Sequence, residues 1–409
     1  MFGVALIIAI LLIGGELSKN NSLKTYDVME NEQQYNSVDD NHKNHMYCGE
    51  VAYIYAFDIA YEMERQPIDE LLGQSLENYS IGPSKRSPKQ LFFYQPQMVK
   101  LPTEQWHVHG SVVQVKRTIK IFNIGAISIQ IRVPFKVEKI IDLVDYHELK
   151  FARSSIEDEV KLLAEKTKKE LEPYCVQPVS YLTQIENYTV FCLHDLPNIN
   201  DCSGFQAEAW LKTNRLEIAG LLTEEANTDY LSEQEAVEST GQYLTYYCND
   251  LVVIDWDAAL VVGGNDSLDD ILYIMEVANV QLVELSAYDR FLDGSLEKAY
   301  RDLAKRRVKV SREIHRSLRE IRVDLVRFSD ELSNITKFFG DWHLARIYTN
   351  LSNRFHLADW YSVVREKLKT LGDLYQLLQQ DWVNFWMVLL EATIVLLFVL
   401  DVILLLVGL

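Results

Sequence analysis

Two carboxylates lie inside the most apolar stretch of the chain. Glu391 and Asp401 are the only charged residues from Val383 to Leu409. A helix of about 27 residues spans roughly 40 Å, which exceeds the ~30 Å hydrocarbon core of a bilayer. Acids cost free energy in hydrocarbon, so we expect both to face protein or water. They would set the register of an oligomer, line a path for cations, or lie protonated and hydrogen-bonded between helices.

A heptad pattern leads into this stretch. Large apolar residues recur at alternating spacings of four and three, which predicts one continuous helix that carries a coiled-coil seam towards the membrane. Such a seam packs on helices of its own chain or on a second copy, and we expect both, hence a homo-oligomer. The seam consists of Leu357, Tyr361, Val364, Leu368, Leu371, Tyr375, Leu378 and Trp382. Its continuation through Leu389, Ala392, Leu396, Val399 and Ile403 leaves both acids outside it.

A second periodic set is cationic. The same spacing places five basic side chains on one face of a helix predicted over about 308–338 and the residues before it. This face is either solvated and paired with the protein's own acids, or it binds an anionic partner, RNA or acidic lipid. The basic face consists of Lys305, Lys309, Arg312, Arg316 and Arg319.

Residue pairs suited to metal or nucleophilic chemistry are incomplete. His107 and His109 share one face of a predicted strand, but zinc needs three or four ligands. Cys192 and His194 have the same spacing, without a third residue to orient them. The sequence also lacks the phosphate-binding, dinucleotide-binding and hydrolase motifs. We therefore expect no enzyme, cofactor, metal site or small-molecule substrate.

Composition indicates a globular protein. The chain has 409 residues, of which 48% are hydrophobic, and a net charge of −19. That charge argues against binding of nucleic acid by the whole surface. The five cysteines are odd in number and contain no C-x-x-C pair, so neither a disulfide framework nor a zinc knuckle is indicated.

Strand patterns precede the helical ones. Residues 111–135 alternate apolar and polar side chains on both sides of Asn123–Gly125, which predicts a hairpin. Strands are also predicted near the start of the domain, at 187–194 and at 251–262, and Ser155 begins a helix over 154–172. The fold class is therefore α+β with a largely antiparallel sheet. The predicted segments are an apolar possible anchor (1–15), a polar linker (16–46), the α+β domain (47–262), a helical coiled-coil stalk (267–381) and a transmembrane helix (382–409).

Positive charges predict the orientation. Lys19 and Lys24 follow the first apolar segment, and Arg365, Lys367 and Lys369 precede the last one. The positive-inside bias places the main domain in the cytoplasm or on a matrix-equivalent side, with a C-terminal anchor. Residues 2–15 are short for a span. They are a second anchor, a signal-like segment, or the product of a misassigned start codon.

The second half of the chain resembles a known family. A strand segment (249–262), a long helix (276–289), the basic helix RFHLADW (354–360), the heptad helix and the two spaced acids of the anchor are similar to the family named "required for meiotic nuclear division", which includes YagE-like proteins. The resemblance is best over 249–409. It implies a membrane-anchored α+β protein with a helical stalk and no assigned reaction, and its eukaryotic members include mitochondrial inner-membrane proteins that support organellar translation.

Overall fold

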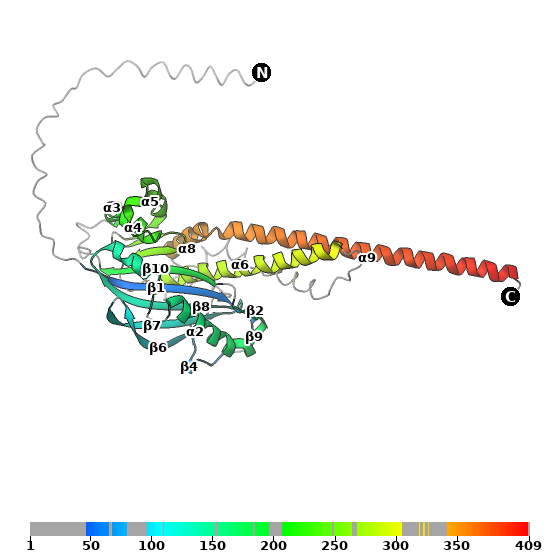
Figure 1. Cartoon of the computed structure of the whole chain (residues 1–409), viewed down its shortest axis with the longest axis horizontal. Helices are drawn as coiled ribbons and strands as arrows, with labels where there is room; N and C mark the ends of the chain where they lie inside the picture. The colour runs from blue at the N-terminus through cyan, green and yellow to red at the C-terminus, as the bar shows by residue number, and fades with distance from the viewer. Residues whose placement is uncertain are drawn as a thin grey trace, which may run out of the picture. The chain divides into compact units, whose positions relative to one another are not determined.

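A computed structural model gives the arrangement of the main body of the chain (Figure 1). The predicted anchor and linker at the start of the chain lie outside its described residues, as does most of the predicted helix over 308–338. The structure describes residues 46–64, 68–79, 96–108, 110–151, 154–182, 185–195, 207–247, 249–263, 268–304, 319, 322–323, 326 and 342–407.

A large mixed sheet forms the centre of the described chain. Its order is β11-β12-β13-β10-β1-β8-β7-β6-β5, and every pairing is antiparallel except that of β10 with β13. The predicted α+β class with a largely antiparallel sheet is therefore confirmed. The strands are β1 (Tyr47–Asp58), β5 (Glu77–Asn78), β6 (Gln97–Val108), β7 (Ser111–Phe122), β8 (Ala126–Val137), β10 (Ile185–Asp195), β11 (Tyr243–Leu244), β12 (Leu251–Ile254) and β13 (Ala258–Val262). Two small sheets pair β2 (Ala60–Met63) with β9 (Cys175–Pro178) and β3 (Glu70–Leu71) with β4 (Gln74–Ser75).

The predicted hairpin is present as β7 and β8. Gly125 lies in its turn at φ +84°, a conformation that side chains disfavour. A Cβ there would stand 1.9 Å from the carbonyl oxygen of Ala60, so glycine is also required by space. The predicted strand over 251–262 is instead two strands, because Asp255, Trp256 and Asp257 form a tight connection that folds β13 back on β12.

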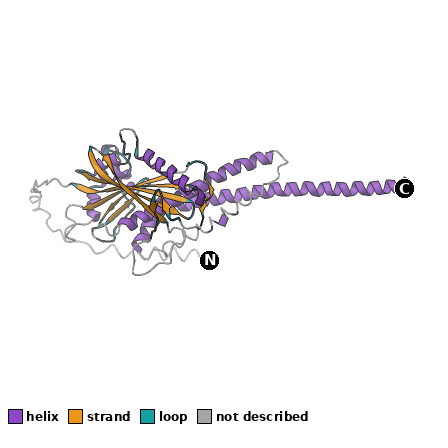
Figure 2. Cartoon of the chain, turned by 90° about the horizontal axis from the view of Figure 1, so that it is seen from below, coloured by secondary structure: helices purple, strands orange, loops and turns teal. Residues whose placement is uncertain are grey.

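Alternate residues of β1 contribute to two different cores. Ala52, Ile54 and Ala56 face one side, while Tyr53 and Phe57 face the other, and all five are buried. A strand that is covered on both faces has an almost continuously apolar sequence, and β1 has such a sequence. Figure 2 shows helices on both sides of the strands.

Short helices cover the face that contains Tyr53. Ser155 caps α2, where its hydroxyl accepts a hydrogen bond from the Asp158 amide, as its position predicted. The elements on this side contribute buried side chains to the second core. They include η1 (Ile140–Tyr146), α2 (Ile156–Leu171), α3 (Ala207–Thr213) and α4 (Arg215–Leu222), with η2 (Glu172–Tyr174), η3 (Thr228–Tyr230) and α5 (Glu233–Ser239) nearby in sequence.

Long helices cover the opposite face in the part of the chain that the structure describes. They are α6 (Leu268–Ala304), α8 (Trp342–Arg354) and α9 (Leu357–Val407). The first half of α6 packs directly on the sheet, and its side chains share one core with those of β1, β10, β12 and β13. The first half of α6 thus belongs to the core of the sheet domain, and the described residues do not show a separate coiled-coil stalk.

The start of α9 corrects one sequence expectation. The segment 354–360 was expected to be a single basic helix. Instead α8 ends at Arg354, and His356 adopts a positive φ of 51° before α9 begins at Leu357. From there the helix continues without interruption through Val407, as the heptad pattern predicted, and runs beside α6 over its first part (Figure 1).

Candidate functional site

The helix α9 has two halves with different surroundings. Leu357, Val364, Leu368, Leu371 and Tyr375 are buried in the core that contains α6. Tyr361 packs partly buried against the same core, whereas the side chains of Leu378 and Trp382 lie outside the described set. The first part of the predicted seam is thus covered by the protein's own chain.

The second half of α9 is apolar, and its described side chains are exposed. Residues Val383–Leu406 form a helix long and apolar enough to cross a membrane, and none of the most apolar window is buried. A water-soluble protein rarely exposes so long a continuous apolar surface. This segment is therefore the first candidate for a functional surface.

Both predicted intramembrane acids lie on this exposed segment. Glu391 and Asp401 are ten positions apart, which at 100° per residue places them about 80° apart around the helix axis and ~15 Å apart along it. They share a face whose members again follow a four-three spacing, on the other side of the helix from the continued seam. The acid face consists of Met387, Glu391, Ile394, Phe398, Asp401 and Leu405.

The predicted basic face cannot be traced in the same way. Lys305, Lys309, Arg312 and Arg316 lie outside the described residues. Arg319 is described as an exposed helical residue. The cationic stripe therefore stays a prediction from the sequence.

A buried charged pair joins α6 to the sheet. Lys120 of β7 forms an ion pair with Glu276 of α6, and both side chains are almost completely buried. The Lys120 ammonium also lies 4.7 Å from the ring centre of Tyr79 and 5.2 Å from that of Tyr273, within cation–π range. The pair fixes α6 on the strand because separating it would leave a charge in the core.

Polar groups continue along the same sheet face. Arg132 donates to Glu50 at 3.2 Å and lies 2.6 Å from the carboxylate of Asp269 at the start of α6. On β8, Ser128 lies opposite Lys120, and Gln130 lies between Ser128 and Arg132. The Ser128 hydroxyl and the Gln130 amide nitrogen are buried without a partner among the described residues. Arg132 and Glu50 are mostly buried, whereas the Asp269 side chain is 69% exposed, so the cluster holds the start of α6 at the edge of the sheet face.

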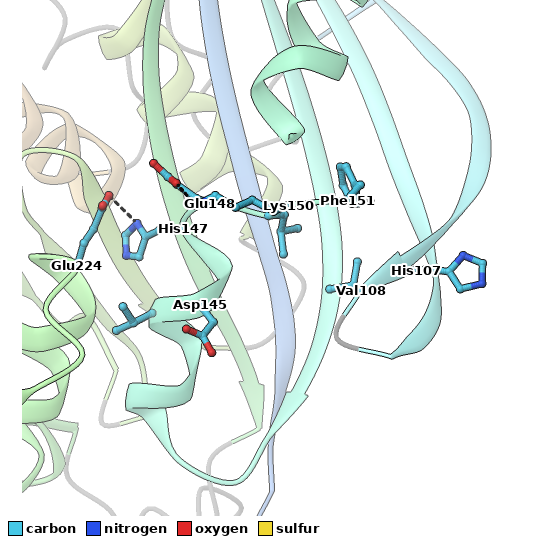
Figure 3. Close-up of a pocket in the computed structure, with 10 residues that line it drawn as sticks. His107, Val108, Asp145, His147, Glu148, Lys150, Phe151 and Glu224 are labelled. Atoms are coloured by element: carbon cyan, nitrogen blue, oxygen red, sulfur yellow. Dashed lines mark ion pairs between the residues drawn. The ribbon is translucent and has the colours of Figure 1, made fainter. Parts of the chain in front are cut away.

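A shallow cavity of about 410 Å³ opens near the end of η1 (Figure 3). Its lining mixes carboxylates, histidines and apolar side chains from η1, the loop after it, β6 and the turn after α4. The residues are His107, Val108, Val144, Asp145, His147, Glu148, Leu149, Lys150, Phe151 and Glu224.

His147 is the buried titratable group of this cavity. Its Nε2 lies 2.6 Å from the Leu221 carbonyl oxygen, and its Nδ1 lies 3.1 Å from the Glu224 carboxylate. Burial lowers the pKa of the imidazole, while the carbonyl and the carboxylate oppose that shift. Both ring nitrogens are engaged, so His147 links η1 to α4 and offers no open position to a ligand.

The two residue pairs considered for metal or nucleophilic chemistry, His107 with His109 and Cys192 with His194, gain no third partner residue in the described structure. His107 lies at the rim of the cavity on β6, and His109 is outside the described residues. Cys192 is fully buried, and burial raises the pKa of its thiol, which disfavours the reactive thiolate. Among the residues that the structure describes, no group of three His, Cys, Asp or Glu side chains is placed to hold a metal ion.

Sequence reasoning missed the Lys120–Glu276 pair. The two residues are 156 positions apart, and pairing at that distance depends on the fold. A signal was present nonetheless, because Glu276 interrupts an apolar helix segment and Lys120 interrupts an apolar strand. Charged residues in such positions are almost never fully buried unless paired.

Comparison with known proteins identifies a different family from the one expected. A protein-family model described as "Uncharacterized protein MJ0711, N-terminal domain" matches residues 48–267, more than half of the chain. The uncharacterised protein MJ0711 of Methanocaldococcus jannaschii is 25% identical over 224 residues, which cover 54% of this chain and 66% of that protein. No solved structure matches the chain.

The resemblance to the meiotic nuclear division family is therefore wrong. It depended on helical periodicity and an apolar segment with two acids, features that packing and a membrane impose on unrelated chains. The family match instead covers the sheet domain, where that resemblance was weakest. The alignment with the archaeal relative spans just under two thirds of its length. This chain belongs to the family described as the uncharacterised protein MJ0711, N-terminal domain.

Proposed function

We propose that the protein is a membrane-tethered, non-enzymatic scaffold whose sheet domain recruits a partner on the cytoplasmic or matrix-equivalent side. One observation carries this proposal: α9 is a single helix whose first half is built into the core and whose second half is apolar and uncovered. A domain attached in this way is held close to a bilayer without a flexible link.

Deletion of residues 383–409 tests the tether. This segment contributes no buried side chain to the described core, so the shortened chain should fold and stay in the soluble fraction. The full chain should float with vesicles and resist alkaline carbonate extraction. A full chain that is released by carbonate would overturn the proposal. Protease digestion of oriented vesicles then decides on which side the sheet domain lies.

The proposed partner is anionic and binds the basic face. Replacement of Arg312, Arg316 and Arg319 by Glu should abolish binding of the full chain to RNA or to vesicles that contain acidic lipid. Binding of the unchanged protein should weaken steeply as salt rises, because phosphate contacts release counterions. Binding that ignores both salt and the triple substitution would instead support a solvated face.

A cation channel is the alternative, and the shared face of Glu391 and Asp401 is the observation that favours it. A homo-oligomer with these acids inside would conduct cations through a ring of carboxylates. The buried seam residues are already occupied by α6, so such an oligomer would have to use the membrane half of α9. Cation flux into liposomes that is lost in Glu391→Gln and Asp401→Asn would favour the channel over the scaffold.

A further inference from the structure

The membrane half of α9 has one face with two carboxyl groups, for which lipid tails provide no hydrogen-bond or charge partner. Glu391 and Asp401 stand on the acid face, and the side chains around them are large, apolar and open, with Phe398 70% exposed. Ionisable side chains within a membrane are almost always turned towards another protein segment or a water-filled space. The acid face is therefore an interaction surface whose occupant is not part of this chain's described structure.

The membrane half of α9 itself offers these acids no counter-charge. No Lys or Arg occurs from Val383 to Leu409. Thr393, the nearest hydroxyl, donates to the Leu389 carbonyl at 2.7 Å within its own helix. A charge partner for Glu391 and Asp401 at this depth therefore has to come from outside residues 383–409.

A second copy of the chain is a poor match by charge. A symmetric parallel pair through the acid face would place Glu391 beside Glu391 and Asp401 beside Asp401. Like carboxylates in a medium of low dielectric constant cannot both ionise. A helix that carries a basic residue would neutralise the acids and also complete their hydrogen bonds.

We propose that the acid face docks a transmembrane helix of another protein that carries a Lys or Arg within the membrane. The spacing of the face supports this, because its four apolar residues and two acids together follow the four-three spacing of helix–helix seams. The inference rests on the membrane-tethered function proposed above and names its partner by chemistry.

The test uses the full chain in phosphatidylcholine vesicles with synthetic Leu/Ala transmembrane helices. Three peptides differ in one central residue, which is Lys, Leu or Glu. Energy transfer between labelled protein and labelled peptide should show at least tenfold tighter association with the Lys helix than with the Leu or Glu helices. The double variant Glu391→Gln/Asp401→Asn should lose that preference, and Glu391→Lys/Asp401→Lys should reverse it in favour of the Glu helix.

Three other results of this experiment would overturn the proposed partner, the proposed tether, or both. Equal association with all three peptides would overturn the basic-helix partner and leave the tether intact. Energy transfer between two copies of the protein that disappears in Glu391→Gln/Asp401→Asn, without any peptide preference, would assign the face to a second copy. A full chain that fails to insert into the vesicles would overturn the tether together with this inference.

Discussion

At the scale of single residues, the buried pair of Lys120 and Glu276 should be strongly coupled. Lys120→Met leaves Glu276 buried without a counter-charge, which we expect to cost about 3–5 kcal/mol of unfolding free energy. Lys120→Met combined with Glu276→Leu should cost clearly less than the sum of the single changes. Urea unfolding of the full chain in detergent, followed by tryptophan fluorescence, measures all three variants.

An exposed pair provides the matched control. Lys161 and Glu157 form an ion pair one turn apart on α2, with both side chains about half exposed. Lys161→Met should change stability by less than about 1 kcal/mol, since solvent screens such pairs. A double variant in the core that is as unstable as the summed single variants would contradict the coupling.

Asp58 at the end of β1 gives the protein a pH-dependent stability. Burial raises the pKa of its carboxyl from 3.8 to about 7. The native state therefore binds a proton more tightly than the unfolded state, and stability should fall as pH rises from about 4 to about 7, with a limiting slope of about 1.4 kcal/mol per pH unit.

The variant Asp58→Asn isolates this contribution. It should be as stable as the unchanged protein near pH 4 and more stable above pH 7, because the amide carries no charge. His147 acts in the opposite direction, since its lowered pKa removes stability as pH falls. The measurement is therefore the difference in unfolding free energy between the variant and the unchanged protein at each pH. A difference that stays constant with pH would contradict the raised pKa of Asp58.

At the scale of elements, the contact of α6 with α9 should depend on the seam. Leu371 is fully buried in it, whereas Leu377 on the same helix is 54% exposed. Leu371→Ala should lower the unfolding free energy by about 2–5 kcal/mol, and Leu377→Ala should change it by less than about 0.5 kcal/mol. Equal effects of the two changes would contradict the observed packing.

The same seam allows self-association to be separated from folding. Leu368→Asp combined with Leu371→Asp places two charges in a seam that α6 already covers. We expect loss of the α6–α9 contact and rapid cleavage by protease, not a folded protein of lower mass. Sedimentation combined with limited proteolysis distinguishes these results, and a folded variant that changes only its oligomeric mass would place an intermolecular contact there.

The sequence predicted elements best where one pattern acts locally. The alternation on both sides of Gly125 identified β7 and β8, and the heptad spacing identified α9 as one helix. At β6 the sequence predicted a strand only around His107 and missed the full length, because Pro102 and a register shift interrupt the polar, exposed half of the strand. The joint core of α6 and the sheet was also missed, since the contact between Glu276 and Lys120 depends on the fold and not on local periodicity.

At the scale of the whole molecule, the uninterrupted helix should limit how freely the sheet domain moves over a bilayer. The same helix is packed on α6 up to Tyr375 and is uncovered from Val383 onward. Inserting Gly-Ser-Gly-Ser between Gln379 and Gln380 should leave both the core and the membrane segment unchanged. It should nevertheless broaden the distribution of distances between the sheet domain and the membrane surface, because glycine-rich segments are flexible.

A four-alanine insertion at the same place is the control. Alanine continues the helix, so it should lengthen the connection by ~6 Å and rotate the acid face by about 40° without broadening the distribution. Energy transfer from a label on the sheet domain to a dye in the lipid headgroups reports both the mean distance and its spread. If the unchanged protein already shows the broad distribution of the glycine variant, the helix bends between its two halves, and the close tether would have to be abandoned.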